Sequence, residues 1–329
     1  MELDKIDKDL LNIIQLELPL SREPFVALDL RLGIGSDEII RRIEQLKMRG
    51  IIRLIGPVFN PRRLGYRTTL VAMKLQEKQL DMASQIISAN PMVSHCYERD
   101  HDLNFWFTLA MPEGEDMDTE VRKLGDRLKS ETTLNLSAVK TFKIGAYFNL
   151  DGHTKPVPAM STYHSGLSDT DFELSAADRT IINVLQQDLP LNEKPFDIIS
   201  ARLAMDADEF LGHCQALLLS GIMRRFSASI SHNKLGFLAN AMACWKVPSD
   251  MVDAAGKKIA AITEISHCYE RRTNSLWRYN LFAMIHAETE ETCRAITDKI
   301  CADTGLDRKE MILLFSTKEI KKTRVQYKV

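Results

Sequence analysis

The sequence of 329 residues lacks several features that would place it in a common class of protein. Lysine and arginine number 43 against 45 aspartate and glutamate, so no overall charge marks the chain as a polyanion-binding protein. No apolar run approaches the roughly 20 residues that are needed to cross a bilayer. The first residues, MELDKIDKDLL, turn charged at once and do not resemble a secretory signal. We therefore expect a cytoplasmic protein without a membrane segment.

Cysteine is sparse, and its spacing excludes two kinds of site. The six cysteines stand at positions 96, 214, 244, 268, 293 and 301, and no two of them form a CxxC pair. Neither a zinc ribbon nor a thioredoxin-like centre is therefore expected. We expect the six thiols to be reduced and mostly buried.

What the sequence does contain is a repeat of itself. The six residues SHCYER occur at 94–99 and again at 266–271. A shift of 171 residues superposes LPL at 18–20 on LPL at 189–191, and after a one-residue slip the two SHCYER copies fall into line. Self-similarity on this scale indicates one folding unit of about 150 residues that is written twice. Two such units in one chain are expected to pair as a pseudo-symmetric dimer.

Each unit begins with a pattern typical of three short helices. In the first copy, apolar residues recur at helical spacing over residues 4–17, and Pro24 opens a second helix that ends near Gly33. Ser36 is expected to cap a third helix, and residues 51–59 follow as a β wing. Three short helices with a glycine-containing turn before the third favour a helix-turn-helix.

The rest of each unit alternates between strand and helix patterns. In the first copy we expect strands near 68–75, within 93–111 as a pair, and near 136–144, with helices near 78–89 and 115–130. This βαββαβ order is the ferredoxin-like arrangement. The second copy repeats it, with strands near 238–247, 264–270, 279–286 and 311–315.

The predicted fold class is therefore α+β, a tandem duplication of a winged helix-turn-helix domain and a ferredoxin-like domain that forms an intrachain pseudo-dimer. The segment that joins the copies is rich in Gly, Pro, Ser and Thr, which is typical of a linker. The expected segments are a helix-turn-helix domain with its wing at 1–62, a ferredoxin-like domain at 63–150, the linker at 151–175, a second helix-turn-helix domain at 176–233 and a second ferredoxin-like domain at 234–329.

The third helices of the two copies differ in charge, which bears on DNA binding. The first carries Arg41, Arg42, Lys47 and Arg49, whereas residues 207–221 of the second copy contain no lysine or arginine. A dimeric DNA reader needs two equivalent recognition helices and cations that reach phosphates. The leucines at 217–219 suggest that the second helix packs against protein instead. We therefore do not expect DNA binding.

The repeated motif places three functional side chains in a row. Because side chains alternate across a strand, His95, Tyr97 and Arg99 lie on one face, and Cys96 and Glu98 lie on the other. The second copy repeats the row with His267, Tyr269 and Arg271. One such row is most simply an exposed sheet face with satisfied polar groups. Two copies favour a site.

The loops that follow the two motifs add further polar and aromatic side chains. They are His101, Asn104 and Trp106 in the first copy, and Arg272, Trp277, Arg278, Tyr279 and Asn280 in the second. Arginine binds carboxylates through paired, charge-assisted hydrogen bonds, and tryptophan or tyrosine stacks on flat conjugated ligands. A flat anion with several carboxylates would match this set. Histidine adds either a proton donor near neutral pH or an axial ligand to a metal inside such a ring.

A helix-turn-helix joined to a ferredoxin-like domain resembles the Lrp/AsnC family of transcriptional regulators over nearly the whole chain. That resemblance leaves open a regulator that senses haem or a small anion, for which Arg41, Arg42 and Lys47 are the best support. Fold alone does not decide between functions.

The strings SHCYERDHDLNFWFTL and SHCYERRTNSLWRYNLFAMIH resemble more narrowly the signature strands of the siroheme decarboxylases, which are Lrp/AsnC-like enzymes. The chain looks like the two related subunit types of that family fused in one polypeptide. The resemblance implies removal of CO2 from the C12 and C18 acetate side chains of siroheme, giving 12,18-didecarboxysiroheme on a route to haem b or haem d1. It also implies no organic cofactor, because the iron enters as part of the substrate.

The resemblance and the residue chemistry together suggest roles for these side chains. We expect His95 and His267, with Tyr97, Tyr269 and His101, to supply or relay protons. Either histidine is also a candidate axial ligand to the tetrapyrrole iron, and no metal site made by the protein alone is expected. The substrate-binding set is expected to be Arg99, Asn104, Trp106, Arg271, Arg272, Trp277, Arg278, Tyr279 and Asn280. Whether both halves are catalytic, and whether the fused chain forms a homodimer, the residues leave open.

Overall fold

The computed structural model describes residues 3–145, 147–148, 150 and 173–329. These divide into two compact units, and each unit takes matching segments from both copies of the repeat. One unit consists of residues 1–64, 147–235 and 327–329, and the other of residues 65–146 and 236–326. The expected linker lies outside the described residues except for 173–175.

The first unit holds the helices that the sequence predicts. The first copy contributes α1 (Lys5–Ile14), α2 (Pro24–Leu32) and α3 (Ser36–Met48), and the second contributes α6 (Ala176–Leu185), α7 (Pro195–Arg202) and α8 (Ala207–Leu219). Pro24 opens α2, and Gly33 ends it in the left-handed conformation, as expected. The prediction for Ser36 was wrong by one position, because Ser36 is already helical and Gly35 takes the cap position without a side-chain bond.

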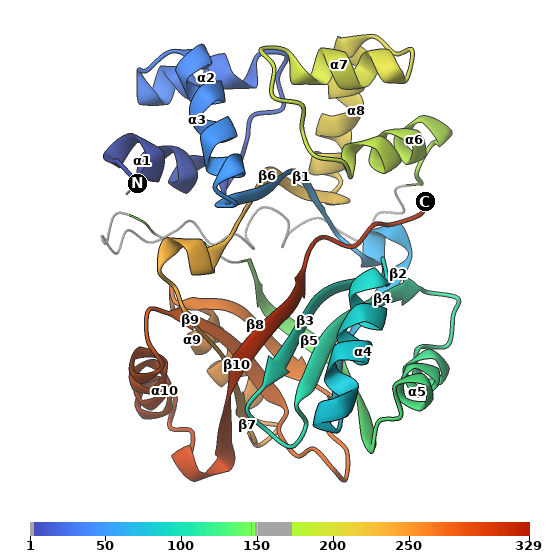
Figure 1. Cartoon of the computed structure of the whole chain (residues 1–329), viewed down its shortest axis with the longest axis vertical. Helices are drawn as coiled ribbons and strands as arrows, with labels where there is room; N and C mark the ends of the chain where they lie inside the picture. The colour runs from blue at the N-terminus through green and yellow to red at the C-terminus, as the bar shows by residue number, and fades with distance from the viewer. Residues whose placement is uncertain (1–2, 146, 149, 151–172) are drawn as a thin grey trace. The chain divides into compact units, whose positions relative to one another are not determined.

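The two wings form one sheet. Each copy contributes a single strand, β1 (Ile52–Phe59) and β6 (Met223–Ile230), and the two pair antiparallel with Ile55 opposite Ala228. Figure 1 shows this ribbon crossing between the two sets of three helices. The strand that a lone wing would leave unpaired therefore finds its partner in the other copy, as a pseudo-dimer requires.

The cations of α3 are engaged within the protein. Arg41 pairs with Glu38, Arg42 with Asp4, Asp7 and Glu38, and Lys47 with Asp188. In α8, Leu217 is buried, as expected of a helix that packs on protein. Leu219 is 73% exposed, so the expectation that all three leucines pack was wrong for this residue, which ends the helix on its outer face.

The second unit contains the strands and helices of both ferredoxin-like segments, in the expected βαββαβ order. The first copy runs β2 (Tyr66–Lys74), α4 (Glu77–Ala89), β3 (Val93–Arg99), β4 (Phe105–Pro112), α5 (Met117–Leu128) and β5 (Thr132–Ile144). The second runs β7 (Ala239–Trp245), α9 (Val252–Ala260), β8 (Ile265–Arg271), β9 (Leu281–Ala287), α10 (Glu290–Thr304) and β10 (Met311–Lys322).

The eight strands close into one barrel in the order β10-β3-β4-β2-β5-β8-β9-β7. Two seams join the copies, β3 with β10 and β5 with β8, both antiparallel. The sequence predicted a strand only at 311–315, but β10 continues to Lys322 because its second part pairs with β3 while its first part pairs with β7. In Figure 1 the four helices of this unit lie outside the strands.

Alternation along the strands divides the barrel into a helix-covered outer face and an inward face. Val71, Cys96 and Phe107 belong to the outer core that packs under α4 and α5. A matching core of the second copy packs under α9 and α10. The inward face has its own apolar cluster, which includes Trp106, Trp277, Phe282, Met242 and Leu314. An eight-stranded barrel is just wide enough for such side chains or one small ligand.

All six cysteines are buried, as expected. In the part of the chain that the structure describes, no helix is both long and apolar enough to span a membrane.

Candidate active site inside the barrel

The repeated motif points its three side chains into the barrel. Cys96 and its counterpart Cys268 lie in the helix-covered cores, so the alternating residues of β3 and β8 face inward. These are His95, Tyr97 and Arg99 on β3 and His267, Tyr269 and Arg271 on β8. The predicted division of the motif between two faces is thus confirmed, and the barrel brings the two rows to one interior.

The two arginines are held in the same way, each across a seam. Arg99 donates from Nη1 to the carbonyl oxygen of Leu314 at 2.9 Å, and Arg271 donates from Nη1 to that of Leu136 at 2.7 Å. The Nε atoms of both are buried and lack a hydrogen-bond partner among the described residues. No carboxylate of the described chain forms an ion pair with either guanidinium.

This environment disfavours the charge that the arginines carry. Burial lowers the pKa of Arg99 to about 10 and also lowers the pKa of Arg271. Burial raises the pKa of the Cys244 thiol on β7. The positive charges of Arg99 and Arg271 oppose that rise, so both guanidinium groups act on this one sulfur. Cations that burial desolvates and that have no anionic partner among the described residues are unfavourable. They are an arrangement that an anionic ligand would stabilise.

The tyrosines lie against these cations, and the histidines follow them on the same faces of the strands. The Arg99 guanidinium lies 5.5 Å from the ring centre of Tyr97, and that of Arg271 lies 4.7 Å from the ring centre of Tyr269. The histidines differ in their partners: His95 Nδ1 is 2.8 Å from Ser94 Oγ, whereas His267 Nδ1 is 3.2 Å from Tyr269 Oη, with the two rings stacked. The two halves therefore hold their imidazoles differently.

The predicted tryptophans form a core. Trp106 is 1% and Trp277 is 3% exposed, and their ring centres are 5.4 Å apart in an edge-to-face pair. His101 and Tyr279 pack on Trp277 at 5.9 Å and 5.1 Å, and His101 Nδ1 accepts from the backbone N–H of Leu103. These four side chains pack together at the motif loops, and their expected contact with a flat ligand stays a prediction.

The predicted asparagines tie the motif loops to neighbouring strands. The Asn104 amide bonds both the N–H and the carbonyl of Leu75, at 3.0 and 2.9 Å. The Asn280 amide does the same with Val247, at 2.8 and 2.9 Å. Both amides are thus bonded to backbone in this structure, and the expected ligand contact of the two residues stays a prediction.

Two of the predicted arginines lie apart from the interior. Arg272 is exposed, and Arg278 is exposed beside Glu310 at 3.4 Å. Their place in the loop after β8 brings neither of them to Arg99 and Arg271.

Sequence reasoning missed four further side chains that the strand alternation turns inward, namely Cys244, Met284, Asn240 and His286. The alternation of β7 and β9 was the signal that could have found them.

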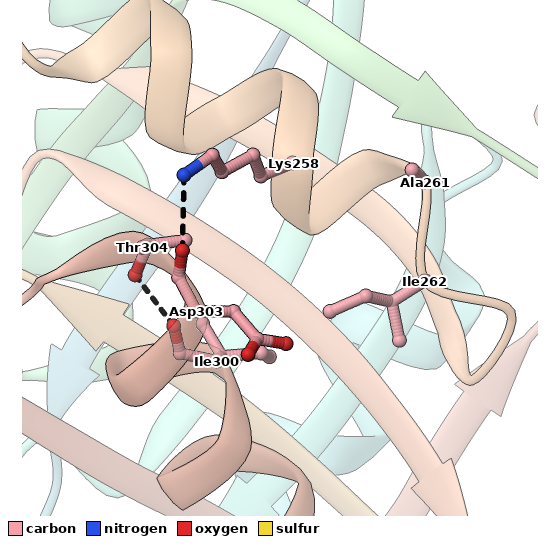
Figure 2. A pocket seen from close by; sticks show the side chains of 6 residues that line it. All are labelled: Lys258, Ala261, Ile262, Ile300, Asp303 and Thr304. Carbon is pink, nitrogen blue, oxygen red and sulfur yellow. Dashed lines mark hydrogen bonds between the residues drawn. The ribbon is translucent and has the colours of Figure 1, made fainter.

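A separate depression lies on the outer helices. It has a volume of about 430 Å³ and is lined by Lys258, Ala261, Ile262, Ile300, Asp303 and Thr304. Figure 2 shows Lys258 bridging to the backbone of Asp303 on α10. Its lining is mostly apolar, with no histidine or arginine.

Nowhere in the described ranges do three or more His, Cys, Asp or Glu side chains group as metal ligands.

The fold and the interior together define a protein of the AsnC-like class, in which two ligand-binding segments share one barrel. A model of the AsnC-like ligand binding domain matches residues 63–143 and 234–321, and a model of the siroheme decarboxylase NirDL-like HTH domain matches residues 7–53 and 178–224. The chain belongs to the siroheme decarboxylase family.

Three relatives illustrate the extent of that membership. A siroheme decarboxylase of Hydrogenobacter thermophilus is 38% identical over 99% of this chain and 95% of its own. A siroheme decarboxylase alpha subunit of Desulfovibrio desulfuricans is 39% identical and covers 46% of this chain and 86% of its own, as expected if this chain fuses two subunits. The solved structure of the siroheme decarboxylase NirDL with an iron-uroporphyrin III analogue is 34% identical, covers 99% of this chain and 95% of that one, and has a TM-score of 0.72.

Proposed function

We propose that this chain is a carboxy-lyase that removes CO2 from the C12 and C18 acetate side chains of siroheme and yields 12,18-didecarboxysiroheme. The observation that carries the proposal is the pair of inward arginines, Arg99 and Arg271, which have no carboxylate partner among the described residues and share one barrel with two His-Tyr rows. A tetrapyrrole with several carboxylates supplies the missing negative charge.

The proposed binding role falls to Arg99 and Arg271. Each uses one N–H on a backbone carbonyl and keeps its Nε–H without a partner among the described residues. A guanidinium binds a carboxylate through two parallel donors, and it does so more strongly in a site of low dielectric constant. These residues would hold the carboxylates that stay on the ring.

The reaction needs one proton for each acetate that is lost. Cleavage of the bond between the side-chain CH2 and its carboxylate releases CO2 and leaves an electron pair, which the conjugated ring accepts. Protonation of that carbon then gives the methyl group. A positioned general acid typically contributes about 100-fold to 10,000-fold to the rate. We assign this task to His95 and His267, one in each half, with Tyr97 and Tyr269 as relays.

The iron is part of the substrate, and we propose no organic cofactor. Either histidine remains a candidate ligand to that iron.

A DNA-binding regulator is the less favoured alternative. Arg41, Arg42 and Lys47, its best support, are each in an ion pair with a carboxylate of the same chain. The equivalent helix α8 has no lysine or arginine. Cations that are already neutralised release few counter-ions from DNA and therefore bind it weakly.

The test is anaerobic incubation of the purified protein with siroheme, followed by mass spectrometry of the tetrapyrrole. We expect the loss of two CO2 units. We expect His95→Ala and His267→Ala to slow turnover by about 100-fold or more, each with accumulation of a singly decarboxylated species. Full turnover by both variants would overturn the histidine assignment, and an unchanged siroheme spectrum with the parent protein would overturn the function.

A further inference from the structure

The two halves of the barrel are not chemically equivalent beyond the repeated motif. Tyr97 pairs with Trp106 across β3 and β4, and Tyr269 pairs with Phe282 across β8 and β9, which aligns the two copies residue by residue. Four residues further along, Ala110 of β4 thus corresponds to His286 of β9. Ala110 pairs with Thr68, and His286 pairs with Asn240.

Asn240 is a polar side chain buried inward without a protein partner. Its strand neighbours Ala239 and Ala241 belong to the helix-covered core, and Met242 and Cys244 belong to the inward cluster, so alternation turns Asn240 inward. It is 5% exposed, and neither Oδ1 nor Nδ2 has a hydrogen-bond partner in the described part of the chain. Its counterpart Thr68 is exposed.

The place of Asn240 connects it to the second histidine row. Met284 lies opposite His267, and His286 is two residues further along β9 on the same face. Diagonal neighbours of this kind lie about 7–8 Å apart. Asn240 stands opposite His286. Asn240, His286 and His267 therefore form one inward polar layer, whereas the first half has Thr68, Ala110 and His95 at these positions.

We propose that Asn240 is a specificity-determining residue whose side-chain amide donates a hydrogen bond to a ring carboxylate of the tetrapyrrole, and so fixes which way round the macrocycle lies between the two halves. This inference rests on the proposed function. A buried amide that forms no hydrogen bond costs stability, and chains keep such groups where a ligand satisfies them.

A barrel with two matching halves needs such a feature. The arginines and the His-Tyr rows are repeated, so by themselves they offer the same residue types to the macrocycle after a half turn. A buried amide donor present in one half only favours one of the two orientations. In that one orientation, one particular acetate of the ring faces His95 and the other acetate faces His267. The first decarboxylation then occurs at a single, defined acetate.

The test compares Asn240→Leu with the matched change Thr68→Val in the other half. Three quantities are measured: the melting temperature of the ligand-free protein, the dissociation constant for iron uroporphyrin III by absorbance titration, and the identity of the singly decarboxylated intermediate from siroheme. We expect Asn240→Leu to raise the melting temperature by roughly 2–4 °C, because an unpaired amide is removed. We expect it to weaken binding by about tenfold or more and to yield both intermediates. Thr68→Val should change binding by less than about twofold.

Different failures identify different errors. A lower melting temperature of Asn240→Leu with unchanged binding would mean that Asn240 is structural, and would overturn this inference while leaving the decarboxylase intact. Unchanged binding with a single intermediate, as in the parent, would overturn it equally. An absence of turnover by the parent protein would overturn the proposed function, and the binding comparison would still decide whether Asn240 contacts the macrocycle.

Discussion

Arg99 and Arg271 are costly residues for the ligand-free protein. Arg99 is buried and Arg271 is partly buried, each bonds one backbone carbonyl, and burial lowers the pKa of both. Replacement of buried charges by apolar side chains of similar volume is often neutral or stabilising. Retention of two such charges is a feature of sites in which function and stability conflict.

Arg99→Met tests that conflict directly. We expect the variant to raise the free energy of unfolding of the ligand-free protein by about 1–2 kcal/mol, measured by urea denaturation, and to weaken iron uroporphyrin III binding by at least tenfold. Arg99→Lys, which keeps the charge but loses the planar fork, should also bind weakly and should not gain stability. A loss of stability in Arg99→Met without a change in binding would show that the guanidinium serves the fold alone.

At the scale of single residues, the sequence predicted which side chains of the repeated motif share a face, but it did not predict the hydrogen bonds that the loop residues form with backbone. The alternation of a strand is geometric, so the inward placement of His95, Tyr97 and Arg99 followed from position alone. Asn104 and Asn280 looked equally suited to a ligand, but their amides bond the backbone at Leu75 and Val247. Those partners lie 29 and 33 residues away in sequence, and a one-dimensional pattern does not reveal them.

At the scale of elements, two glycines differ sharply in what surrounds them. A Cβ on Gly256 of α9 would meet ring atoms of Phe142 at 2.5 Å, whereas a Cβ on Gly212 of α8 would meet nothing within 4 Å. Gly256→Ala should therefore lower the free energy of unfolding by about 1–3 kcal/mol through overpacking. Gly212→Ala should raise it by about 0.5–1 kcal/mol through helix propensity. Urea denaturation of both variants measures the contrast, and equal effects would contradict the close packing of α9 on β5.

The start of α6 shows how one carboxylate joins two helices. Asp178 accepts from the N–H of Ser175 in a capping box and lies 2.8 Å from His213 Nδ1 on α8. Burial raises the pKa of Asp178, but the hydrogen bonds from Ser175 and His213 outweigh it and hold the pKa below 3.8.

We expect Asp178→Asn to lower stability at pH 7 by about 1 kcal/mol. Because the folded-state pKa is depressed, the stabilisation is present above the ordinary pKa of 3.8 and is lost as the pH falls below it. The difference in melting temperature between parent and variant should therefore shrink at acidic pH. A difference that persists unchanged below that pH would contradict the assignment to the ionised carboxylate.

At the scale of the whole molecule, the closed barrel depends on strands from both copies of the repeat. The duplicated helix-turn-helix and ferredoxin-like order was readable from periodicity and turn residues. Closure of the barrel was not, because it depends on the edges of β3 and β5 finding β10 and β8 of the other copy. Each single sheet would leave two such edges unpaired.

The seams predict that the copies stay together after the chain is cut. With a protease site inserted within residues 151–172, cleavage should leave a particle of unchanged size in gel filtration and of unchanged decarboxylase activity. The β1–β6, β3–β10 and β5–β8 pairings remain to hold the fragments. Separation of the fragments without denaturant would contradict the closed barrel.

The most direct test of the account is a crystal structure of this protein with iron uroporphyrin III. The account predicts carboxylates of the macrocycle within about 3.2 Å of guanidinium nitrogens of both Arg99 and Arg271, with His95 and His267 facing the ring from opposite halves. A macrocycle bound elsewhere, with both arginines still keeping only the partners they have in the ligand-free protein, would contradict it.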